Sequence, residues 1–234
     1  MPLLSAITDW SPFWLTAQLA VATTLCLNVV ATPLAWWLAN TRSRAKPLVE
    51  ALTALPLVLP ATVMGFYLLI LLSPTSPVGA AWLAVTGSTL TFNFSGLLVA
   101  SVISSLPFAV QPLQAGFEAV GRGAMEAASV LRAGHWDSFF NVAIPLSRRS
   151  FLTAGVLTFA HTVGEFGTIL MVGGAIPGRT QTLSIAVFNR VETIQYAEAH
   201  TLSALLLVFS FVVLLAVYSL NRRTFTFRAQ TPRG

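Results

Sequence analysis

Long apolar runs that contain no charged residue alternate along this chain with short polar segments. No charged side chain occurs between Asp9 and Arg42, and none occurs between Glu50 and Glu118. Because about 20 apolar residues are needed to cross the hydrocarbon core of a bilayer, runs of this length predict membrane-spanning helices. The pattern predicts spans at about residues 13–39, 49–72, 92–113, 151–172 and 201–220. The stretch at residues 80–90 is short and only weakly apolar, so we expect an external loop there.

The composition agrees with a chain that lies mostly in lipid. Of its 234 residues, 55% are hydrophobic and 9% are charged, whereas a soluble domain carries about 25% charged residues. We therefore expect an all-α polytopic membrane protein that forms a single transmembrane domain over residues 1–234. The one cysteine, Cys26, excludes an intrachain disulfide. Residues 1–14 contain no basic side chain, and we expect no cleaved signal peptide.

The basic residues indicate how the chain is oriented. A five-span arrangement places 11 of the 13 basic residues on one side and leaves Arg179 and Arg190 on the other. Since cytoplasmic loops carry the excess of Lys and Arg, this asymmetry predicts an external N-terminus and a cytoplasmic C-terminus. The basic residues form short clusters between apolar runs. That distribution is typical of a protein whose partner is the lipid bilayer, and it argues against nucleic acid as a partner.

Two prolines mark the second expected span as irregular. Pro56 and Pro60 are four residues apart in the segment LPLVLP and would lie on one face of a helix. Each removes a backbone donor, so the helix must kink and its freed carbonyl groups need protein or water nearby. Two interpretations follow: a kink that serves packing alone, and a helix that lines a transport pathway.

The segment at residues 118–149 is the main interruption of the apolar pattern. Acidic and basic side chains alternate there, and Trp136, Phe139 and Phe140 supply apolar contacts close to Gly134. A helix lying flat on the membrane surface is one interpretation. The acidic residues would face an anionic leaflet unfavourably and the glycine indicates a turn. A short helix presented to the groove of another protein is therefore the better fit.

The same segment resembles the EAA loop of ABC importer permeases. That loop reads Glu-Ala-Ala, three residues, Gly, nine residues and Ile-x-Leu-Pro. In this chain residues 126–128 are Glu-Ala-Ala, Arg132 stands at the glycine position, and residues 142–145 are Val-Ala-Ile-Pro. Gly134, two residues after Arg132, is the residue that we expect to supply the turn.

Two further stretches narrow the resemblance to the oxyanion branch of these permeases. LPLVLPATVMGFYLL at residues 55–69 and HTVGEFGTILMVGGAIPGRTQTLSIAVF at residues 161–188 are similar to segments of molybdate permeases, close kin of the sulfate and thiosulfate permeases. The resemblance covers about residues 13–220. It implies import of an oxyanion, with molybdate first because the chain is short, and with tungstate, sulfate or thiosulfate as alternatives.

The resemblance also implies an assembly. It predicts the type I ABC importer permease fold with about five transmembrane helices and a cytoplasmic coupling helix, working by alternating access in the bacterial inner membrane. The implied partners are a second copy of the chain, cytoplasmic ABC ATPase subunits and a periplasmic oxyanion-binding protein. A two-fold pair is also expected because five helices are few to enclose a pathway. The residues assigned to the ATPase contact are Glu126, Ala127, Ala128, Arg132, Gly134, Trp136, Phe139, Phe140 and Pro145.

The sequence contains no phosphate-binding loop. Such a loop needs Lys followed by Ser or Thr after a glycine-rich turn. The sole lysine, Lys46, lies in RAKPL with no glycine beside it. We therefore expect a permease subunit that is not an enzyme and binds no cofactor, with ATP and Mg²⁺ held by the partner ATPase. An intramembrane hydrolase is disfavoured because the chain has no HExxH motif.

Glu165 is the one acidic residue inside an expected span, and His161 precedes it by four residues, so both would share a helical face. Ionisable residues are costly in a membrane and usually functional. Three interpretations compete: a metal site, for which two ligands are too few; a proton relay, which would make this a proton-coupled secondary transporter; and a structural or interface role near the pathway. The residues assigned to the pathway or interface are Pro56, Pro60, His161, Gly164, Glu165, Phe166 and Gly167.

The expected spans contain no Lys or Arg, so they would hold a divalent anion only weakly. Weak binding suits a transporter whose separate receptor supplies the affinity. On the external side, Gly173, Gly174, Gly178 and Arg179 either meet that receptor or form an ordinary flexible loop.

Overall fold

The computed structural model describes residues 9–222, and the regular structure in that part of the chain is entirely helical. In chain order the elements are α1 (Ser11–Asn40), α2 (Lys46–Ala54), η1 (Leu55–Leu57), α3 (Ala61–Leu72), α4 (Pro77–Thr86), α5 (Phe94–Ser104), α6 (Leu106–Val130), α7 (His135–Ser138), the π-helical turn η2 (Phe139–Ala143), α8 (Ile144–Leu146), α9 (Arg148–Gly164), α10 (Gly167–Gly173), α11 (Leu183–Glu192) and α12 (Tyr196–Arg222). The predicted all-α fold is confirmed. Arg223, Arg228 and Arg233, which contribute to the predicted charge asymmetry, lie outside the described residues.

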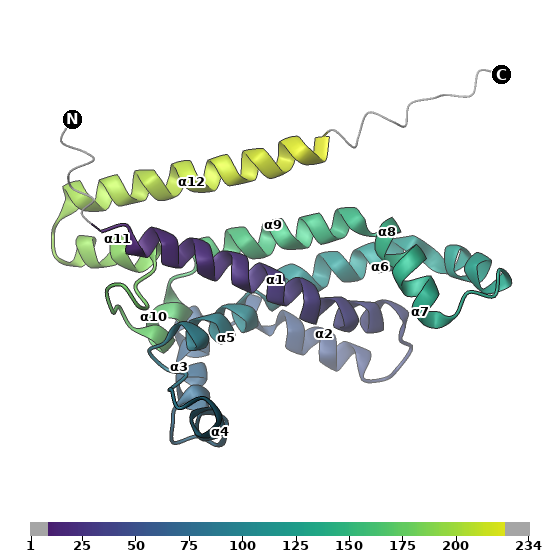
Figure 1. The fold of residues 1–234 in the computed structure, drawn as a ribbon, viewed down its shortest axis with the longest axis horizontal. Coiled ribbons are helices and arrows are strands. Elements are labelled where there is room, and N and C mark those ends of the chain that lie inside the picture. The colour runs from purple at the N-terminus through teal and green to yellow at the C-terminus, as the bar shows by residue number, and fades with distance from the viewer. Residues whose placement is uncertain (1–8, 223–234) are drawn as a thin grey trace.

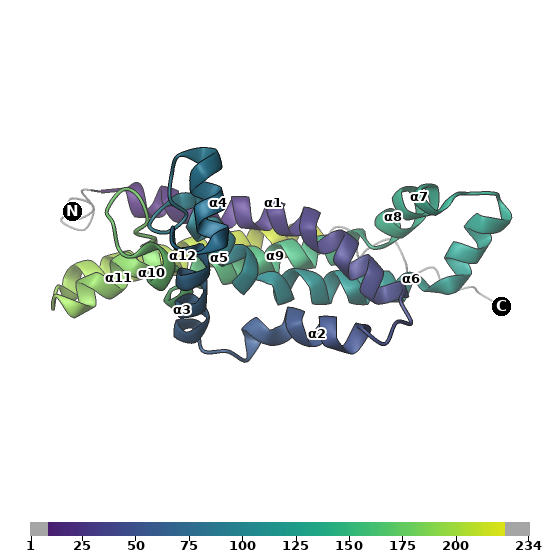
Figure 2. The ribbon, with the colours of Figure 1, turned by 90° about the horizontal axis from the view of Figure 1, so that it is seen from below.

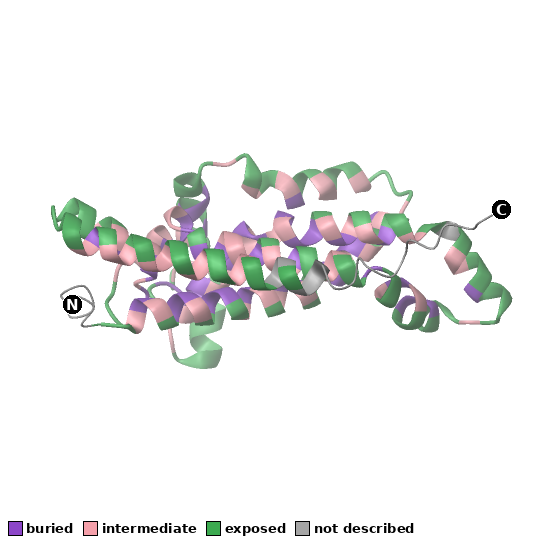
Figure 3. Cartoon of the chain, turned by 90° about the horizontal axis from the view of Figure 1, so that it is seen from above, coloured by how far each residue is buried: buried purple, intermediate pink, exposed green. Residues whose placement is uncertain are grey.

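The helices form an elongated bundle in which α1, α6 and α9 run side by side (Figures 1 and 2). Leu27 and Leu38 of α1 are fully buried against Leu113 of α6 in one half of the bundle. Leu97 of α5 and Ile169 of α10 are fully buried in the other half. α12 contacts α11 and α9, and most of its surface is exposed (Figure 3). The bundle thus packs around its central helices and leaves its outer faces apolar, as expected of a protein surrounded by lipid.

Three of the expected spans are broken rather than continuous. α1 and residues Tyr196–Ala216 of α12 are long and apolar enough to cross a membrane unbroken. Three further helix pairs pass the same test as bent units: α2 and η1 with α3, bent by 109°; α5 with α6, bent by 45°; and α9 with α10, bent by 63°. If each bent pair forms one span, the described residues provide up to five spans.

The break in the second expected span is larger than a proline kink. α2 ends at Ala54, Pro56 lies in η1, and Pro60 directly precedes α3. The prediction that the two prolines share one helical face is therefore wrong, because no continuous helix joins them. Pro60 has a φ of −55° and a ψ of 135°, which turns the chain before α3 begins.

The prediction of an external loop at residues 80–90 is also wrong for residues 80–86, because these belong to α4, which extends to Thr86. The Ser76 hydroxyl accepts a hydrogen bond from the N–H of Gly79 at 2.9 Å, and Pro77 takes the first helical position. Gly87 ends the helix with a φ of 69°, a left-handed conformation that glycine adopts without strain. These start and stop signals outweigh the weak hydropathy of the stretch. α11 lies between the fourth and fifth expected spans, in a segment for which the sequence analysis makes no prediction.

Gly96, in the first turn of α5, packs directly against the chain that precedes the helix. A Cβ atom at this position would lie 2.0 Å from the carbonyl oxygen of Leu90. Because backbone cannot yield as a flexible side chain does, we expect Gly96→Ala to destabilise the fold by about 1–3 kcal/mol, the usual cost of overpacking. Gly123→Ala is the matched control, since nothing lies within 4 Å of its Cβ position. Thermal unfolding in detergent compares the two variants, and equal midpoints would contradict the close approach.

Candidate functional site

Beyond the bundle, α6 continues into a helical projection at one end of the molecule (Figures 1 and 2). The helix is interrupted at Gly121, whose φ of 70° and ψ of 166° are not helical. We call residues 122–147 the coupling segment; it comprises the last turns of α6, the turn that follows, α7, η2 and α8. This segment contains all the residues that the sequence assigns to an ATPase contact.

The inner side of the coupling segment is anchored by aromatic rings. The ring centroid of Phe139 lies 5.1 Å from that of Trp36 in α1 and 6.1 Å from that of Phe117 in α6. The Trp36 and Phe117 rings are themselves 5.2 Å apart. Phe139 and Ala128 are both buried. These two side chains therefore position the segment against the bundle.

Other side chains of the coupling segment are exposed, and they are both polar and apolar. Glu126, Ala127 and Pro145 are exposed. Trp136 is 75% exposed, and its ring stacks on that of Phe140 with 6.2 Å between centroids. Val130 and Leu131, at the end of α6, are each 82% exposed. A cluster of exposed apolar side chains of this kind, bordered by charged residues, indicates a surface for contact with another protein.

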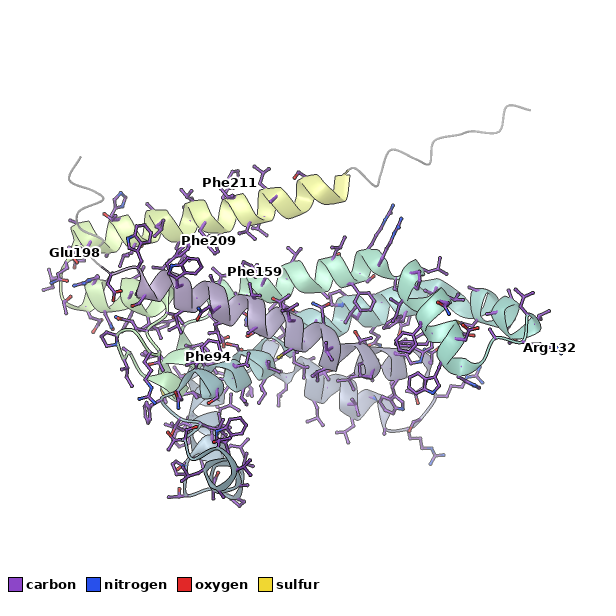
Figure 4. All side chains as sticks on the ribbon, viewed as in Figure 1. Phe94, Arg132, Phe159, Glu198, Phe209 and Phe211 are labelled. Atoms are coloured by element: carbon purple, nitrogen blue, oxygen red, sulfur yellow. The ribbon has the colours of Figure 1, made fainter. Side chains whose placement is uncertain are left out.

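The turn of the coupling segment is made by Arg132, which lies at the tip of the projection (Figure 4). Arg132 has a φ of 61°, in the left-handed region, and its N–H donates to the carbonyl oxygen of Ser129. Gly134 has a φ of −70° and a ψ of 169°, which any residue adopts. The expectation that Gly134 supplies the turn is therefore wrong. The arginine occupies the conformation that suits the glycine of the related pattern.

We expect Arg132→Gly to stabilise the protein by about 1 kcal/mol, because it removes a left-handed conformation from a residue with a Cβ atom. Gly134→Ala should be tolerated, since nothing lies within 4 Å of its Cβ position. The thermal unfolding midpoints of the two variants test this assignment. If Gly134→Ala loses stability and Arg132→Gly gains none, the turn depends on Gly134 and the assignment of the strained conformation to Arg132 is wrong.

A cavity of about 350 Å³ lies between the coupling segment and the ends of α1 and α6. Its lining includes Trp36, Asn40, Gly121, Met125 and Glu126. The segment is therefore not packed solidly against the bundle along this side. The non-helical residue Gly121 and the adjacent space together permit the segment to change its angle to α6.

A polar network that the sequence analysis missed joins α2 to α6. Lys46 Nζ lies 3.7 Å from Glu50 Oε1 and 3.5 Å from Glu118 Oε1. Gln114 Nε2 donates to the same two oxygens, at 2.8 Å and 3.0 Å. The spacing of Lys46 and Glu50 was the one available signal. The network connects the broken second span to the helix that carries the coupling segment.

The breaks of the three bent helix pairs lie at one level of the bundle, which we call the break layer; its Glu165 side is buried and its Ala61 side is exposed. It is defined by Ala61, Ser104, Ser105, Glu165 and Gly167. A Cβ atom on Gly167 would lie 2.8 Å from the Cβ of Ala61. The Thr168 hydroxyl donates to the carbonyl oxygen of Ala61 at 3.4 Å. The start of α3 and the start of α10 are therefore in direct contact.

The break between α5 and α6 joins the same layer through His161. The Ser105 hydroxyl lies 3.0 Å from His161 Nδ1 and 3.2 Å from Thr162 Oγ1. The His161 ring stacks on that of Phe108 with 4.3 Å between centroids. His161 thus has a polar partner and an aromatic partner on the neighbouring bent pair.

Glu165 lies in the break between α9 and α10, where it is 8% exposed. Its carbonyl oxygen accepts a hydrogen bond from Ser184 of α11 at 2.8 Å. Both carboxylate oxygens are buried and have no hydrogen-bond partner among the described residues. The hydroxyls of Ser104 and Thr168 lie near the carboxylate, but neither meets it with hydrogen-bond geometry. An unpartnered acidic group at such depth makes the break layer polar inside an otherwise apolar bundle.

The prediction that His161 and Glu165 share a helical face is wrong. α9 ends at Gly164, and Glu165 has an extended conformation with a φ of −69° and a ψ of 134°. The GEFG motif is therefore the break itself rather than part of a helix. Phe166 turns toward α11, where its ring lies 4.7 Å from that of Phe188. Between residues 9 and 222, no group of three or more His, Cys, Asp or Glu side chains is placed to hold a metal ion.

The glycine-rich stretch between α10 and α11 is ordered by hydrogen bonds. The Thr180 hydroxyl donates to the carbonyl oxygen of Gly173 at 2.7 Å. Gly174 and Gly178 adopt φ values of 65° and 70°. Arg179 Nε donates to Asn93 Oδ1 at 3.4 Å, which links this stretch to the start of α5.

Bent apolar spans whose breaks meet in the bundle, together with a projecting coupling segment, define a membrane permease subunit with the type I ABC importer fold. The chain belongs to the family of binding-protein-dependent transport system inner membrane components, whose profile matches residues 31–226. It is thus a multi-pass inner-membrane permease subunit rather than an enzyme, in agreement with the sequence-based prediction.

Relatives and solved structures support the same class. The chain is 54% identical to the molybdenum transport system permease protein ModB of Azotobacter vinelandii, over 92% of this chain and 95% of that relative. It is 32% identical to the sulfate transport system permease protein CysT of Escherichia coli, over 81% of this chain and 68% of that relative. A bacterial alginate ABC transporter, solved with an alginate-bound periplasmic protein, shares the fold with a TM-score of 0.77 at 15% identity, covering 95% of this chain and 82% of that chain.

Proposed function

We propose that this chain is the permease subunit of an ATP-driven importer of molybdate. The observation that carries this proposal is the 54% identity to a molybdenum transport permease over 92% of the chain, against 32% to a sulfate permease. The chain would lie in the bacterial inner membrane with its N-terminus outside and its C-terminus in the cytoplasm. Tungstate, sulfate and thiosulfate are the alternative substrates.

In this proposal the coupling segment transmits the motion of a cytoplasmic ABC ATPase, which holds ATP and Mg²⁺. Glu126, Ala127, Trp136 and Phe140 contact the ATPase, since their side chains are exposed on the segment. Phe139 and Ala128 keep the segment attached to the bundle. Movement about Gly121 then reaches the second span through α6 and the Lys46 network.

The break layer is the proposed site at which the pathway opens and closes. Three bent helix pairs contact one another there, so a change in one bend alters the others. The residues concerned are Pro56, Pro60, His161, Gly164, Glu165, Phe166 and Gly167. Packed elements switch between discrete arrangements more readily than they deform continuously, which suits alternating access.

The face formed by α2, η1 and α3 is the proposed contact with a second copy of the chain. Val58, in the break between η1 and α3, is 81% exposed, and Leu57 and Pro60 are also exposed. Irregular backbone at membrane depth is tolerated where it is buried in protein or lines a water-filled cavity, because lipid cannot form hydrogen bonds with its free polar groups. A two-fold partner on this face would cover the break and place the pathway between the two copies.

A periplasmic oxyanion-binding protein would supply the affinity for the substrate. The α1, α3, α5 and α10 segments contain no Lys or Arg. An anion inside the spans therefore meets neutral hydroxyl and amide groups, which hold it weakly and release it readily. The external ends of α5 and α10, where Arg179 is held by Asn93, would face the loaded receptor.

Transport by the chain reconstituted in proteoliposomes, with its ATPase and binding protein, tests the proposal. Uptake of molybdate, tungstate and sulfate is measured in parallel, with and without internal ATP and with and without a protonophore. We expect uptake that requires ATP and the binding protein, persists when the proton gradient is collapsed, and is fastest with molybdate. Uptake driven by a proton gradient without ATP would identify a secondary transporter instead.

Glu165→Gln separates the two mechanisms at the level of one residue. Under the proposed function, ATP-driven uptake by this variant should stay within about twofold of the parent, because Gln keeps the size and polarity of Glu in the break layer. A proton relay through His161 and Glu165 requires an ionisable group, so the same change would abolish transport. Glu165→Leu is the companion variant that removes the polar group altogether.

A further inference from the structure

A groove runs between α1, α9 and α12 on the outside of the bundle. It encloses about 350 Å³ and is lined by Thr24 and Asn28 of α1, by Leu152, Gly155 and Phe159 of α9, and by Val213 of α12. Figure 4 shows Phe209 of α12 turned toward Phe159 and Phe211 turned away from the bundle. The ring centroids of Phe159 and Phe209 are 6.2 Å apart, so α9 and α12 are in contact beside the groove.

The depth of the groove depends on Gly155. A Cβ atom on this residue would find Asn28 Nδ2 at 3.6 Å and Thr24 Cγ2 at 3.7 Å, which are ordinary contact distances. Larger side chains at this position would therefore fill the groove without colliding with backbone. Asn28 contributes little polarity to the floor, because its Nδ2 donates to the carbonyl oxygen of Thr24 within α1.

A basic side chain lies on the same face of α9 as the residues that line the groove. Arg148 is the first residue of α9, and it precedes Leu152, Gly155 and Phe159 by 4, 7 and 11 residues. These intervals place all four residues on one side of the helix, with Arg148 about 6 Å below Leu152 along the axis. Arg148 is exposed and forms no ion pair with any residue in the described part of the chain.

We propose that this groove binds one acyl chain of an anionic phospholipid whose headgroup phosphate contacts Arg148. The apolar walls suit a hydrocarbon chain lying parallel to the helices, and the guanidinium group suits a phosphate oxygen. The assignment uses the predicted orientation, in which this end of α9 faces the cytoplasmic leaflet, where anionic lipids attract basic side chains. A second copy of the chain is instead expected on the α2–η1–α3 face, so it does not compete for this groove.

Lipid binding by the full chain in neutral detergent tests the proposal without any measurement of transport, so its failure is distinct from failure of the proposed function. Phosphatidylglycerol and phosphatidylcholine with identical acyl chains are titrated separately, and bound lipid is counted by native mass spectrometry. We expect phosphatidylglycerol to bind more tightly. Arg148→Gln should weaken its binding about fivefold, the factor that corresponds to one lost basic contact near an anionic surface. Arg44→Gln, in the loop after α1, is the matched control and should leave binding unchanged.

Gly155→Leu tests the groove itself and should reduce the binding of both lipids, while Arg148→Gln affects the anionic lipid alone. Equal affinity for the two lipids in the parent, or unchanged binding in Arg148→Gln, would overturn the proposal. A further test mixes copies that carry Gly155→Cys with copies that carry Val213→Cys, all on a Cys26→Ala background. A disulfide between two copies would also overturn the proposal, because it would identify a second protein chain as the occupant of the groove. Arg148→Gln alters an exposed residue, so it remains informative if Gly155→Leu fails to fold.

Discussion

Glu126→Lys is expected to abolish transport while the partner ATPase continues to hydrolyse ATP. Glu126 is an exposed acidic residue of the coupling segment, at the mouth of the cavity beside Gly121 and Met125. A charge reversal there places a cation against the ATPase surface that the glutamate would contact. Removing one partner of a charge pair that is buried on docking costs about 2–5 kcal/mol, which corresponds to a loss of about thirtyfold or more in coupled transport.

The measurement compares ATP hydrolysis and substrate uptake in the same proteoliposomes. Glu192→Lys is the matched control, because Glu192 is an exposed acidic residue at the end of α11, away from the coupling segment. The control should transport at the parental rate, and both variants should insert and fold normally. Normal uptake by Glu126→Lys would show that the coupling segment does not make this contact.

Gly167→Ala is expected to have the second large effect, on both stability and transport. The added Cβ would lie 2.8 Å from the Cβ of Ala61, so α10 and α3 must move apart at the break layer. Neither methyl group has a rotatable bond through which to yield, and overpacking of this kind costs about 1–3 kcal/mol. Since the break layer is the proposed point of opening, the displaced helices should also slow uptake by about tenfold or more.

The same GEFG motif supplies the control for this prediction. Nothing lies within 4 Å of the Cβ position of Gly164, the last residue of α9. Gly164→Ala should therefore keep or slightly raise the unfolding midpoint and leave transport intact. If the two alanine variants behave alike, the close approach of α3 and α10 is not what requires glycine at residue 167.

Features that depend on a single stretch of sequence, such as membrane spans and polar segments, could be predicted without the structure. The charge-free runs placed α1 and α12 correctly, because the length and apolarity of one segment decide whether it can cross a bilayer. The polar residues at 118–149 identified the projecting segment, since charged side chains cannot remain in lipid. The start and stop signals of α4 were also present in Ser76, Pro77 and Gly87, but low hydropathy was given more weight than capping.

The candidate site depended more on tertiary contacts. Sequence spacing put His161 and Glu165 on one helical face, yet the chain breaks after Gly164 because Phe166 packs against Phe188 and Ser184 binds the carbonyl group of Glu165. α6 ends at Val130, so the left-handed residue that follows the helix is Arg132. Gly134, two residues later, has an ordinary extended conformation. Neither outcome can be derived from periodicity, since both depend on where a helix stops.

The sequence by itself determined the class of protein, the approximate position of its spans and the location of the projecting polar segment, because these follow from the cost of placing charge in lipid and from short local patterns. Only the tertiary structure decided that two further spans are bent besides the one with Pro56 and Pro60, that the breaks meet around Glu165, and that Lys46 joins α2 to α6. The physical reason is that bends and contacts between distant residues are set by the packing of one helix against another. A close approach such as that of Gly167 to Ala61 exists only once both helices are in place.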